Sequence, residues 1–324
     1  MTNPGLRLIR LELLRGCPLA CVHCSAESGP GRWEQMTPHQ VEALLQDAAT
    51  LGAKRVVFTG GEPLEYAHLL TSLSVAQSLG FHTTIYTTGI TGRGPIKAVD
   101  RSLLDLVAPR VDTFVFSLYS DRPEIHDKVT TVSGSLKMTV EAVEFFRQRA
   151  VTVNFSFLPL SENWRDLVGV ARLAQERGVE EIRVLKLMKQ GRAARNGRLS
   201  EPVPDAFSEI VREARQKSAR VAIRVGGAAG VYGTDTVCEA LDSELFVGVD
   251  GWIAACPGAI PRLSDEFSNC FEVGLAEVWR NSEYLRGIRT LRASGLTCAS
   301  AGCLARLAME SDDQVPVLVD TNLG

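Results

Sequence analysis

The sequence has no surplus of basic charge and no long apolar run. Its 35 lysines and arginines face 38 aspartates and glutamates, so the formal net charge is −3, and it has 5 histidines. This balance leaves no basic footprint for nucleic acid. Nowhere do about eighteen apolar residues follow one another, and the apolar stretch at residues 8–14 is interrupted by charges and too short for a signal peptide. We therefore expect a cytoplasmic protein without a nucleic-acid or membrane partner.

Eight cysteines in a compartment that keeps thiols reduced are better explained by metal binding than by disulfide bonds. Three of them, Cys17, Cys21 and Cys24, form a CxxxCxxC loop directly after an apolar strand. A four-iron cluster normally takes four cysteine ligands, so three thiolates leave one iron open for another ligand. The ordinary alternatives are a structural zinc site, which would want four nitrogen or sulfur ligands, and a disulfide pair in a secreted protein.

A second motif follows at the end of the next apolar run, where Val56–Thr59 leads into Gly60, Gly61, Glu62 and Pro63. Glycines let the backbone approach a ligand closely, and proline fixes the turn that follows. Alone, this tetrapeptide would be a turn with one negative side chain. Its place downstream of the cysteine loop favours a ligand-binding interpretation.

Together, the CxxxCxxC loop and the GGEP motif resemble the radical S-adenosylmethionine (radical SAM) superfamily. The resemblance implies a cluster whose open iron is chelated by the amine and carboxylate of S-adenosylmethionine. It also implies reductive cleavage to a 5′-deoxyadenosyl radical, which abstracts hydrogen from unactivated carbon. In the family, the backbone of the GGEP motif, with the equivalent of Glu62 nearby, receives the methionine amino group.

Short β-branched runs alternate with helical stretches from residue 8 to about residue 188, as in parallel βα units. The predicted strands are residues 8–14, 55–59, 82–87, 113–118, 152–158 and 181–187. This pattern predicts an α/β fold, a partial (β/α)6 TIM-type barrel, which the family also has, with ligands at the C-terminal strand ends. We expect the barrel at 1–225, a small auxiliary domain at 226–310 and a tail at 311–324.

Strand ends supply the other candidates for the S-adenosylmethionine site. Ser117 closes the fourth predicted strand, Asn154 lies on the fifth, and Leu185 begins the segment after the sixth. In similar proteins these positions contact the ribose, carboxylate or adenine. In many relatives an arginine follows a His-Asp pair; here His126–Asp127 is followed by Lys128, which we regard as a weak substitute. The alternative is that Ser117 and Asn154 are ordinary polar residues at the ends of strands, without a role in binding.

Five further cysteines cluster in the last third of the chain: Cys238, Cys256, Cys270, Cys298 and Cys303. A glycine five residues before Cys256, on a predicted β-hairpin, and a helical segment at 275–291 resemble the SPASM/Twitch cluster domain. The resemblance implies that Cys238, Cys256, Cys298 and Cys303 hold an auxiliary four-iron cluster. The CxxxxC pair departs from the usual CxxC, and the three further cysteines of a full SPASM domain are missing. The shorter Twitch type is therefore the better match.

Cys270 breaks the spacing of this set. It is either a buried small apolar residue, a cluster ligand, or a hydrogen-atom donor. A thiol facing a substrate radical inverts the carbon, as in radical SAM epimerases. We therefore expect epimerisation of a small polar substrate, an aminoglycoside-type sugar or a short peptide, in antibiotic or other natural-product biosynthesis, with Cys270 as the donor.

Three other functions remain open. The auxiliary cluster permits a Twitch-type dehydrogenase that oxidises an alcohol of an aminocyclitol, and capture of the radical would give a peptide-crosslinking enzyme. The third alternative is a non-enzymatic iron–sulfur redox sensor. The GGEP loop argues against it, because a sensor needs no chelating cofactor. Because the first strand begins within ten residues of the start, a large leader-binding domain is not expected. We expect Glu12, Lys186 and Arg192 to orient the substrate, and the family chemistry implies a flavodoxin or ferredoxin as electron donor.

Overall fold

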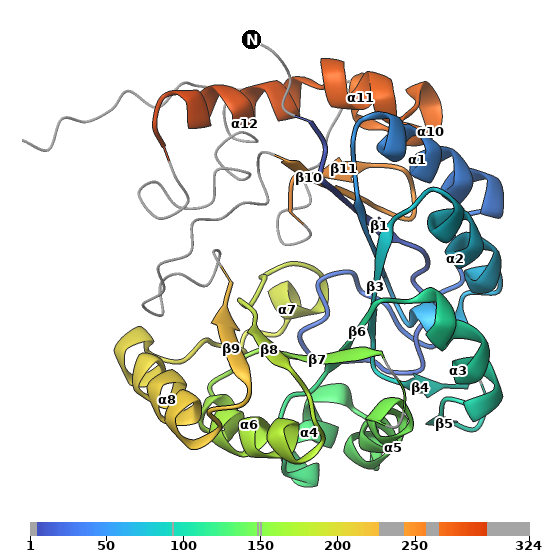
Figure 1. The fold of residues 1–324 in the computed structure, drawn as a ribbon. Helices are drawn as coiled ribbons and strands as arrows, with labels where there is room; N and C mark the ends of the chain where they lie inside the picture. Colours follow the sequence, from blue (N-terminus) through green and yellow to red (C-terminus); the bar gives the residue numbers. More distant parts are fainter. Residues whose placement is uncertain are drawn as a thin grey trace, which may run out of the picture.

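The computed structural model describes residues 5–92, 94–147, 149, 151–226, 243–256 and 266–296. The strands of its main sheet are β1 (Leu8–Glu12), β2 (Arg55–Thr59), β3 (His82–Thr87), β6 (Thr113–Ser117), β7 (Thr152–Phe157), β8 (Glu181–Val184), β9 (Ala222–Val225), β10 (Glu244–Val247) and β11 (Ile253–Ala254). They lie in the order β11-β10-β1-β2-β3-β6-β7-β8-β9, and a separate two-stranded ribbon joins β4 (Ile90–Thr91) to β5 (Lys97–Ala98). All neighbours in the main sheet are parallel except β10 and β11. Viewed as in Figure 1, the sheet curves into an open barrel.

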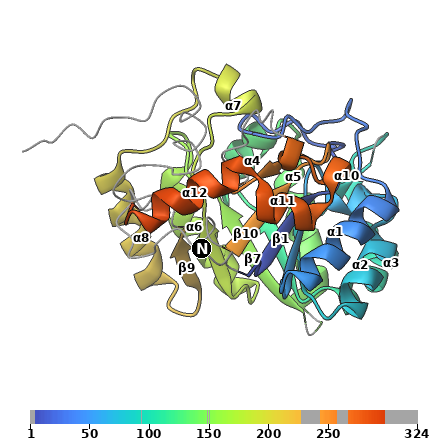
Figure 2. The same cartoon turned by 90° about the horizontal axis from the view of Figure 1, so that it is seen from above.

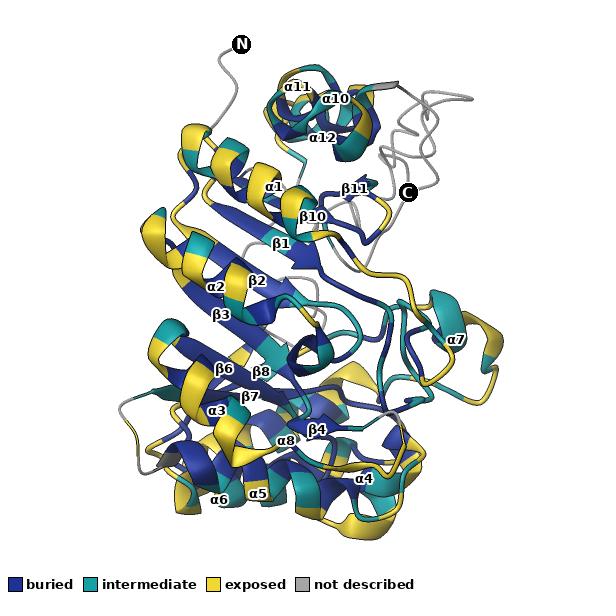
Figure 3. Ribbon diagram, turned by 90° about the vertical axis from the view of Figure 1, so that its right-hand side faces the viewer, coloured by how far each residue is buried: buried dark blue, intermediate teal, exposed yellow. Residues whose placement is uncertain are grey.

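Helices line the outside of this curved sheet (Figure 1). They are α1 (Pro38–Thr50), α2 (Leu69–Ser78), α3 (Arg101–Val107), α4 (Pro123–Thr130), α5 (Ser135–Arg147), α6 (Leu167–Glu176) and α8 (Pro204–Lys217). Near β11 and α1 lie α10 (Cys270–Val273), α11 (Leu275–Asn281) and α12 (Glu283–Ala293). The short α7 (Gly191–Arg195) is different, because it sits at the end toward which the strands point (Figure 3).

The two faces of the sheet carry different side chains. Ile9 and Leu11 on β1, like Ile182 and Val184 on β8, belong to the main apolar core between sheet and helices. Because successive side chains of a strand point to opposite faces, the alternate residues face the barrel interior. Figure 3 shows the resulting continuous burial of the strands. The interior is therefore lined largely by polar groups, whereas the apolar core lies outside the sheet.

The predicted fold class and all six predicted strands are confirmed, with ends shorter by up to three residues. α1 begins at a Thr-Pro pair, and Thr37 and Gln40 form a reciprocal capping box at its start. The helical segment expected at 275–291 is two helices, because Ser282 ends α11 and caps α12. No described helix is long and apolar enough to cross a membrane.

Two strands from the predicted auxiliary region, β10 and β11, belong to the barrel sheet. β10 lies parallel to β1, with Leu8 opposite Glu244 and Leu11 opposite Val247. The expected hairpin follows, since β10 and β11 are antiparallel and Gly251 takes a positive φ of 86° in the turn. The sheet thus continues past residue 225. The boundaries at 225 and 310 remain predictions, and residues 311–324 lie outside the described part of the chain.

Candidate functional site

The cysteine loop and the GGEP motif lie against each other at the C-terminal ends of β1 and β2. The N–H of Gly61 donates to the carbonyl of Leu14 at 2.6 Å, and the N–H of Glu62 donates to the carbonyl of Gly16 at 2.9 Å. A Cβ on Gly61 would overlap the backbone of Gly16, and one on Gly60 would overlap that of Leu14. Both glycines are therefore required so that this turn can reach the chain directly before Cys17.

The three thiols of the loop share one environment. Cys17, Cys21 and Cys24 are free, and they belong to one small apolar cluster with Leu19 and Ile90. Burial raises the pKa of Cys21 to about 12, and the neighbouring Cys24 raises it as well. Thiolates here therefore need positive charge close by, which a bound iron–sulfur cluster would supply. The donor set fits such a cluster, although among the described residues no three His, Cys, Asp or Glu side chains are arranged to hold a single metal ion.

Glu62 contacts protein groups with both carboxylate oxygens. It is fully buried, and its Oε1 accepts from Thr87 Oγ1 at 2.5 Å and from the Leu64 N–H at 3.2 Å. Its Oε2 accepts from the N–H and hydroxyl of Thr88 at 2.8 and 2.6 Å. Burial raises the pKa of Glu62 despite these bonds. The carboxylate thus joins the end of β3 to the GGEP turn, in which Pro63 starts a short 3-10 helix.

The predicted S-adenosylmethionine residues on later strands lie at different depths. Ser117 ends β6, and its hydroxyl accepts from Ser156 at 3.4 Å. Asn154 lies one inward-facing position lower on β7, where its Oδ1 is buried without a partner. Leu185 follows β8 directly, and its side chain is exposed. Their contacts with the cofactor remain predictions.

The His-Asp pair has structural roles. Nδ1 of His126 accepts from the Tyr119 N–H at 3.2 Å, and burial lowers the pKa of His126 to about 4, so the ring stays neutral. Asp127 accepts from the N–H groups of Gly134 and Leu136 at the start of α5. Lys128 pairs with Glu162 at 2.7 Å on the surface. Both side chains are well exposed, so the pair is weak, and the role of Lys128 as a substitute for the arginine of the relatives remains a prediction.

Tyr119 connects the His-Asp pair to the cysteine loop. Its hydroxyl acts to lower the pKa of Cys21, against the larger effect of burial, and its ring meets that of His23 edge-on at 4.8 Å. The backbone of the loop is also fixed to α4, since the N–H of Val22 donates to the carbonyl of Val129 at 2.9 Å. Sequence reasoning missed Tyr119, for which the only signal was its place two residues after Ser117.

Arg192 also has contacts that differ from the role expected from the sequence. Its Nε donates to the carbonyl of Cys21 at 2.9 Å, its Nη2 to that of Ser28 at 2.6 Å, and its N–H to that of Cys24 at 3.0 Å. Figure 2 shows α7 beside the blue loop after β1. Gly191, at φ 55°, lets α7 approach the backbone of Cys24. The expectation that Arg192 orients substrate is therefore wrong, because the side chain is engaged by the cysteine loop.

Glu12 lies at the seam between β1 and the β10 hairpin. It is almost fully buried, and its Oε2 accepts from the Val249 N–H at 3.0 Å and lies 3.7 Å from Arg15. Burial raises its pKa to about 7, and its Oε1 has no partner. A role toward substrate remains a prediction for Glu12, as it does for the half-buried Lys186.

Of the four predicted auxiliary-cluster ligands, the structure describes Cys256, which follows β11 and is half-buried. Cys238, Cys298 and Cys303 lie outside the described residues. Cys270 is buried in the main core, and burial and then Asp47 of α1 raise the pKa of its thiol. Because α1 lies outside the sheet, this position does not support Cys270 as a hydrogen-atom donor to a substrate in the barrel. It supports the buried apolar alternative.

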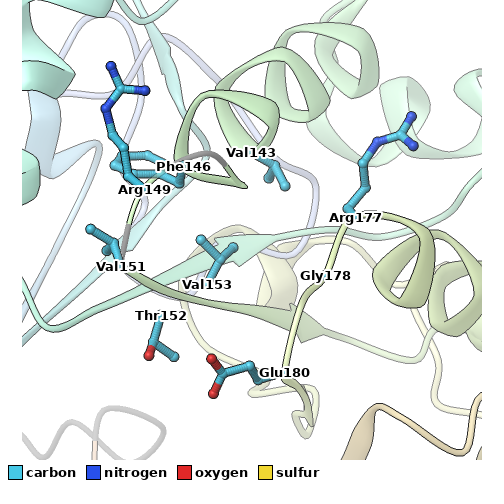
Figure 4. Close-up of a pocket in the computed structure, with 9 residues that line it drawn as sticks. All are labelled: Val143, Phe146, Arg149, Val151, Thr152, Val153, Arg177, Gly178 and Glu180. Atoms are coloured by element: carbon cyan, nitrogen blue, oxygen red, sulfur yellow. The ribbon is translucent and has the colours of Figure 1, made fainter.

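A surface pocket of about 270 Å³ lies away from this site (Figure 4). Val151–Val153 and Gly178 line it together with the guanidinium-bearing Arg149 and Arg177. These segments precede or begin β7 and β8, so the pocket opens at the N-terminal ends of the strands. In barrels of this type the reactive groups gather at the opposite end, so the pocket is not the candidate site.

Comparisons with known proteins agree on one family. The model of the Radical SAM superfamily matches residues 11–174. An AdoMet-dependent heme synthase of Oleidesulfovibrio alaskensis is 23% identical over 320 residues, which cover 89% of this chain and 78% of the relative. A PqqA peptide cyclase of Gluconobacter oxydans is 26% identical over 298 residues, covering 87% and 78%.

Solved structures show the same fold. The crystal structure of Streptococcus suis SuiB bound to S-adenosylmethionine has a TM-score of 0.73 at 16% identity, covering 89% of this chain and 68% of that chain. SuiB bound to its precursor peptide SuiA has a TM-score of 0.72 at 17% identity, covering 93% and 71%. Native anSMEcpe with bound AdoMet and a Cp18Cys peptide has a TM-score of 0.65 at 14% identity, covering 86% and 81%.

Proposed function

Because the chain belongs to the radical SAM superfamily, and its cofactors are therefore S-adenosylmethionine and iron–sulfur clusters, we propose that it crosslinks or cyclises a peptide. The observation that carries the enzymatic part is the contact between the three-cysteine loop and the GGEP turn. Peptide chemistry is supported by the similarity to a PqqA peptide cyclase and by the likeness of fold to SuiB, which was solved with its precursor peptide. Epimerisation loses its basis, since Cys270 lies in the core outside the barrel.

Cys17, Cys21 and Cys24 would hold the cluster, and the backbone of Gly60–Pro63 would hold the methionine end of S-adenosylmethionine. When bound, the cluster and S-adenosylmethionine would together supply a carbon radical that abstracts hydrogen from the substrate. The protein residues around them act by fixing positions. Arg192 holds three carbonyl groups of the cysteine loop, and Tyr119 favours the thiolate form of Cys21. Glu62 fixes the turn beside Cys17 through Thr87 and Thr88.

We also place an auxiliary cluster on Cys238, Cys256, Cys298 and Cys303, within an auxiliary region at residues 226–310. Such a cluster would accept the electron that an oxidative crosslink releases. A flavodoxin- or ferredoxin-type protein would supply electrons to the first cluster. An AdoMet-dependent heme synthase matches the chain over a similar length, so a small-molecule precursor of heme is the second candidate substrate.

The test uses the anaerobically reconstituted chain with dithionite, S-adenosylmethionine and a library of short synthetic peptides. We expect slow formation of 5′-deoxyadenosine by the protein alone and faster formation with a peptide that is processed. The modified peptide should have lost two hydrogen atoms, and fragmentation by mass spectrometry should locate the crosslink. A fully loaded protein that made no 5′-deoxyadenosine would refute the enzymatic proposal. An unchanged peptide mass with inversion at one α-carbon would return epimerisation to the first place.

A further inference from the structure

Two arginines meet one tyrosine inside the barrel. Nη1 of Arg183 on β8 donates to the hydroxyl of Tyr86 on β3 at 3.0 Å, across the interior. Arg10 on β1 lies close enough to Tyr86 and to Cys256 to interact with both electrostatically. The neighbours of Arg10 and Arg183 along their strands all lie in the outer apolar core, so both guanidinium groups project inward.

Each of these two arginines shares its carboxylate partner with a second arginine. Glu244 is shared between Arg10 at 2.8 Å and Arg55 at 3.9 Å. Glu181 is shared between Arg183 at 2.6 Å and Arg224. Each carboxylate is thus divided between two guanidinium groups, so neither Arg10 nor Arg183 has a carboxylate to itself. The other inward-facing acid at this level, Glu12, has a pKa raised to about 7 and is only partly ionised at neutral pH.

The barrel interior around Tyr86 is open to solvent, and it contains a hydrogen-bond acceptor that has no donor. The side chains of Arg10 and Arg183 remain 23% and 35% exposed, although each residue lies within its strand. Asn154 is level with Tyr86, because Tyr86 pairs with Val115 and Val115 with Asn154. The Oδ1 atom of Asn154 is buried and has no hydrogen-bond donor. A group that combines a carboxylate with an N–H or O–H donor would satisfy both features.

We propose that Arg10, Tyr86 and Arg183 form a subsite that binds a carboxylate of the substrate, with Asn154 accepting from a donor beside it. This inference rests on the proposed function and adds that the substrate is an anion. Arginine suits the role because its planar fork matches a carboxylate and stays charged when partly buried. The carboxylate belongs either to an acidic residue of a peptide or to a carboxylated small molecule.

A purely architectural alternative must be separated from this proposal, namely that the ion pairs only join neighbouring strands. The probes are N-acetyl-glutamate N-methylamide, its neutral glutamine analogue, and succinate. Binding is measured by ligand-observed NMR on reconstituted protein saturated with S-adenosylmethionine, without reductant. We expect the glutamate probe to bind about tenfold tighter than the glutamine probe, as one charge-assisted hydrogen bond gives. Succinate binding as tightly as the glutamate probe would assign the site to small carboxylates.

Arg183→Gln and Arg10→Gln should each abolish the preference for glutamate over glutamine. Arg172→Gln is the matched control, because Arg172 pairs with Asp121 on the surface, with its side chain 71% exposed. If the Gln variants fail to fold by circular dichroism, Tyr86→Phe removes one hydroxyl and should still weaken binding of the glutamate probe several-fold.

Three results would overturn the subsite: no measurable binding of any probe to the unmodified protein, equal binding of both amide probes, or a preference that survives Arg10→Gln and Arg183→Gln. Weakened S-adenosylmethionine binding in Arg183→Gln would also overturn it, since the arginines would then hold the cofactor carboxylate. Because no turnover is required, these outcomes are independent of the 5′-deoxyadenosine assay. A protein that prefers the glutamate probe but never cleaves S-adenosylmethionine would keep the subsite and lose the proposed function.

Discussion

Nε of Arg192 donates a hydrogen bond of 2.9 Å to the carbonyl oxygen of Cys21, although 171 positions separate the two residues in the sequence. The bond connects the segment after β8 to the loop after β1. With the bonds to Ser28 and Cys24, it makes α7 a support for the backbone that carries three thiols.

Arg192→Ala should lower the iron bound after reconstitution and destabilise the cysteine loop. Two buried carbonyls would lose charge-assisted donors, at a cost of about 1–3 kcal/mol for each group left unpaired. Iron content and limited proteolysis within residues 20–30 measure the effect. Arg192→Lys keeps the charge without the fork and should be intermediate. Wild-type iron content and proteolysis in Arg192→Ala would contradict a supporting role.

Cys21→Ala should halve the iron of the reconstituted protein, from about eight to about four atoms per chain, if the auxiliary cluster also forms. Cys17→Ala and Cys24→Ala should behave alike, because one missing thiolate leaves the same cluster with two ligands. Cys270→Ala is the matched control and should keep all the iron. A loss of iron in Cys270→Ala would instead make that residue a ligand.

Gly61→Ala should be strongly destabilising, since its Cβ would overlap the carbonyl of Gly16. Overpacking of this kind costs about 1–3 kcal/mol or more. Urea denaturation of the apoprotein measures it without any cofactor. Gly197→Ala is the control, because nothing lies within 4 Å of a Cβ there, and it should be neutral or slightly stabilising. Equal stability of the two variants would show that the turn can shift away from β1.

Glu12 should make the folded protein less stable as pH rises. Its pKa is raised from 4.5 to about 7, so the folded state holds the proton more tightly than the unfolded state. The contribution of Glu12 to stability is therefore largest below pH 4.5, falls through the interval up to about 7, and levels off above it, a change on the order of 3 kcal/mol. Glu12→Gln should remove this contribution, so that the difference in stability between wild type and variant changes with pH across that range, whereas the difference between wild type and Glu42→Gln, on the exposed face of α1, should stay constant. An identical slope in Glu12→Gln would refute the shift.

Much of the scaffold could be predicted, because apolar runs such as Val56–Phe58 indicate buried parallel strands and the glycines and proline of the GGEP motif indicate a tight turn. The contacts that support the cysteine loop could not be predicted. Arg192 stands in a segment rich in glycine, arginine and asparagine that reads as a connecting loop, and nothing local indicates that its partners are carbonyls near Cys21. Tyr119 likewise has its role through contacts with His126 and Cys21, which only the tertiary fold brings together.

The pairing of β10 with β1 also could not be predicted, because the strand Glu244–Val247 is short and follows the region assigned to another domain. A β-hairpin was expected there, and its existence is confirmed. Its parallel partner depends on how far the barrel closes, which the local pattern of residues does not encode.

The pairing of the first strand with a strand beyond residue 240 also sets an order of events during synthesis. A nascent chain that has exposed Cys17, Cys21 and Cys24 still lacks Arg192 and β10, which emerge from the ribosome much later. The loop cannot reach its final shape until the chain has been made past β10. Cluster delivery therefore follows the synthesis of β10, and products truncated before this strand should be unable to retain iron.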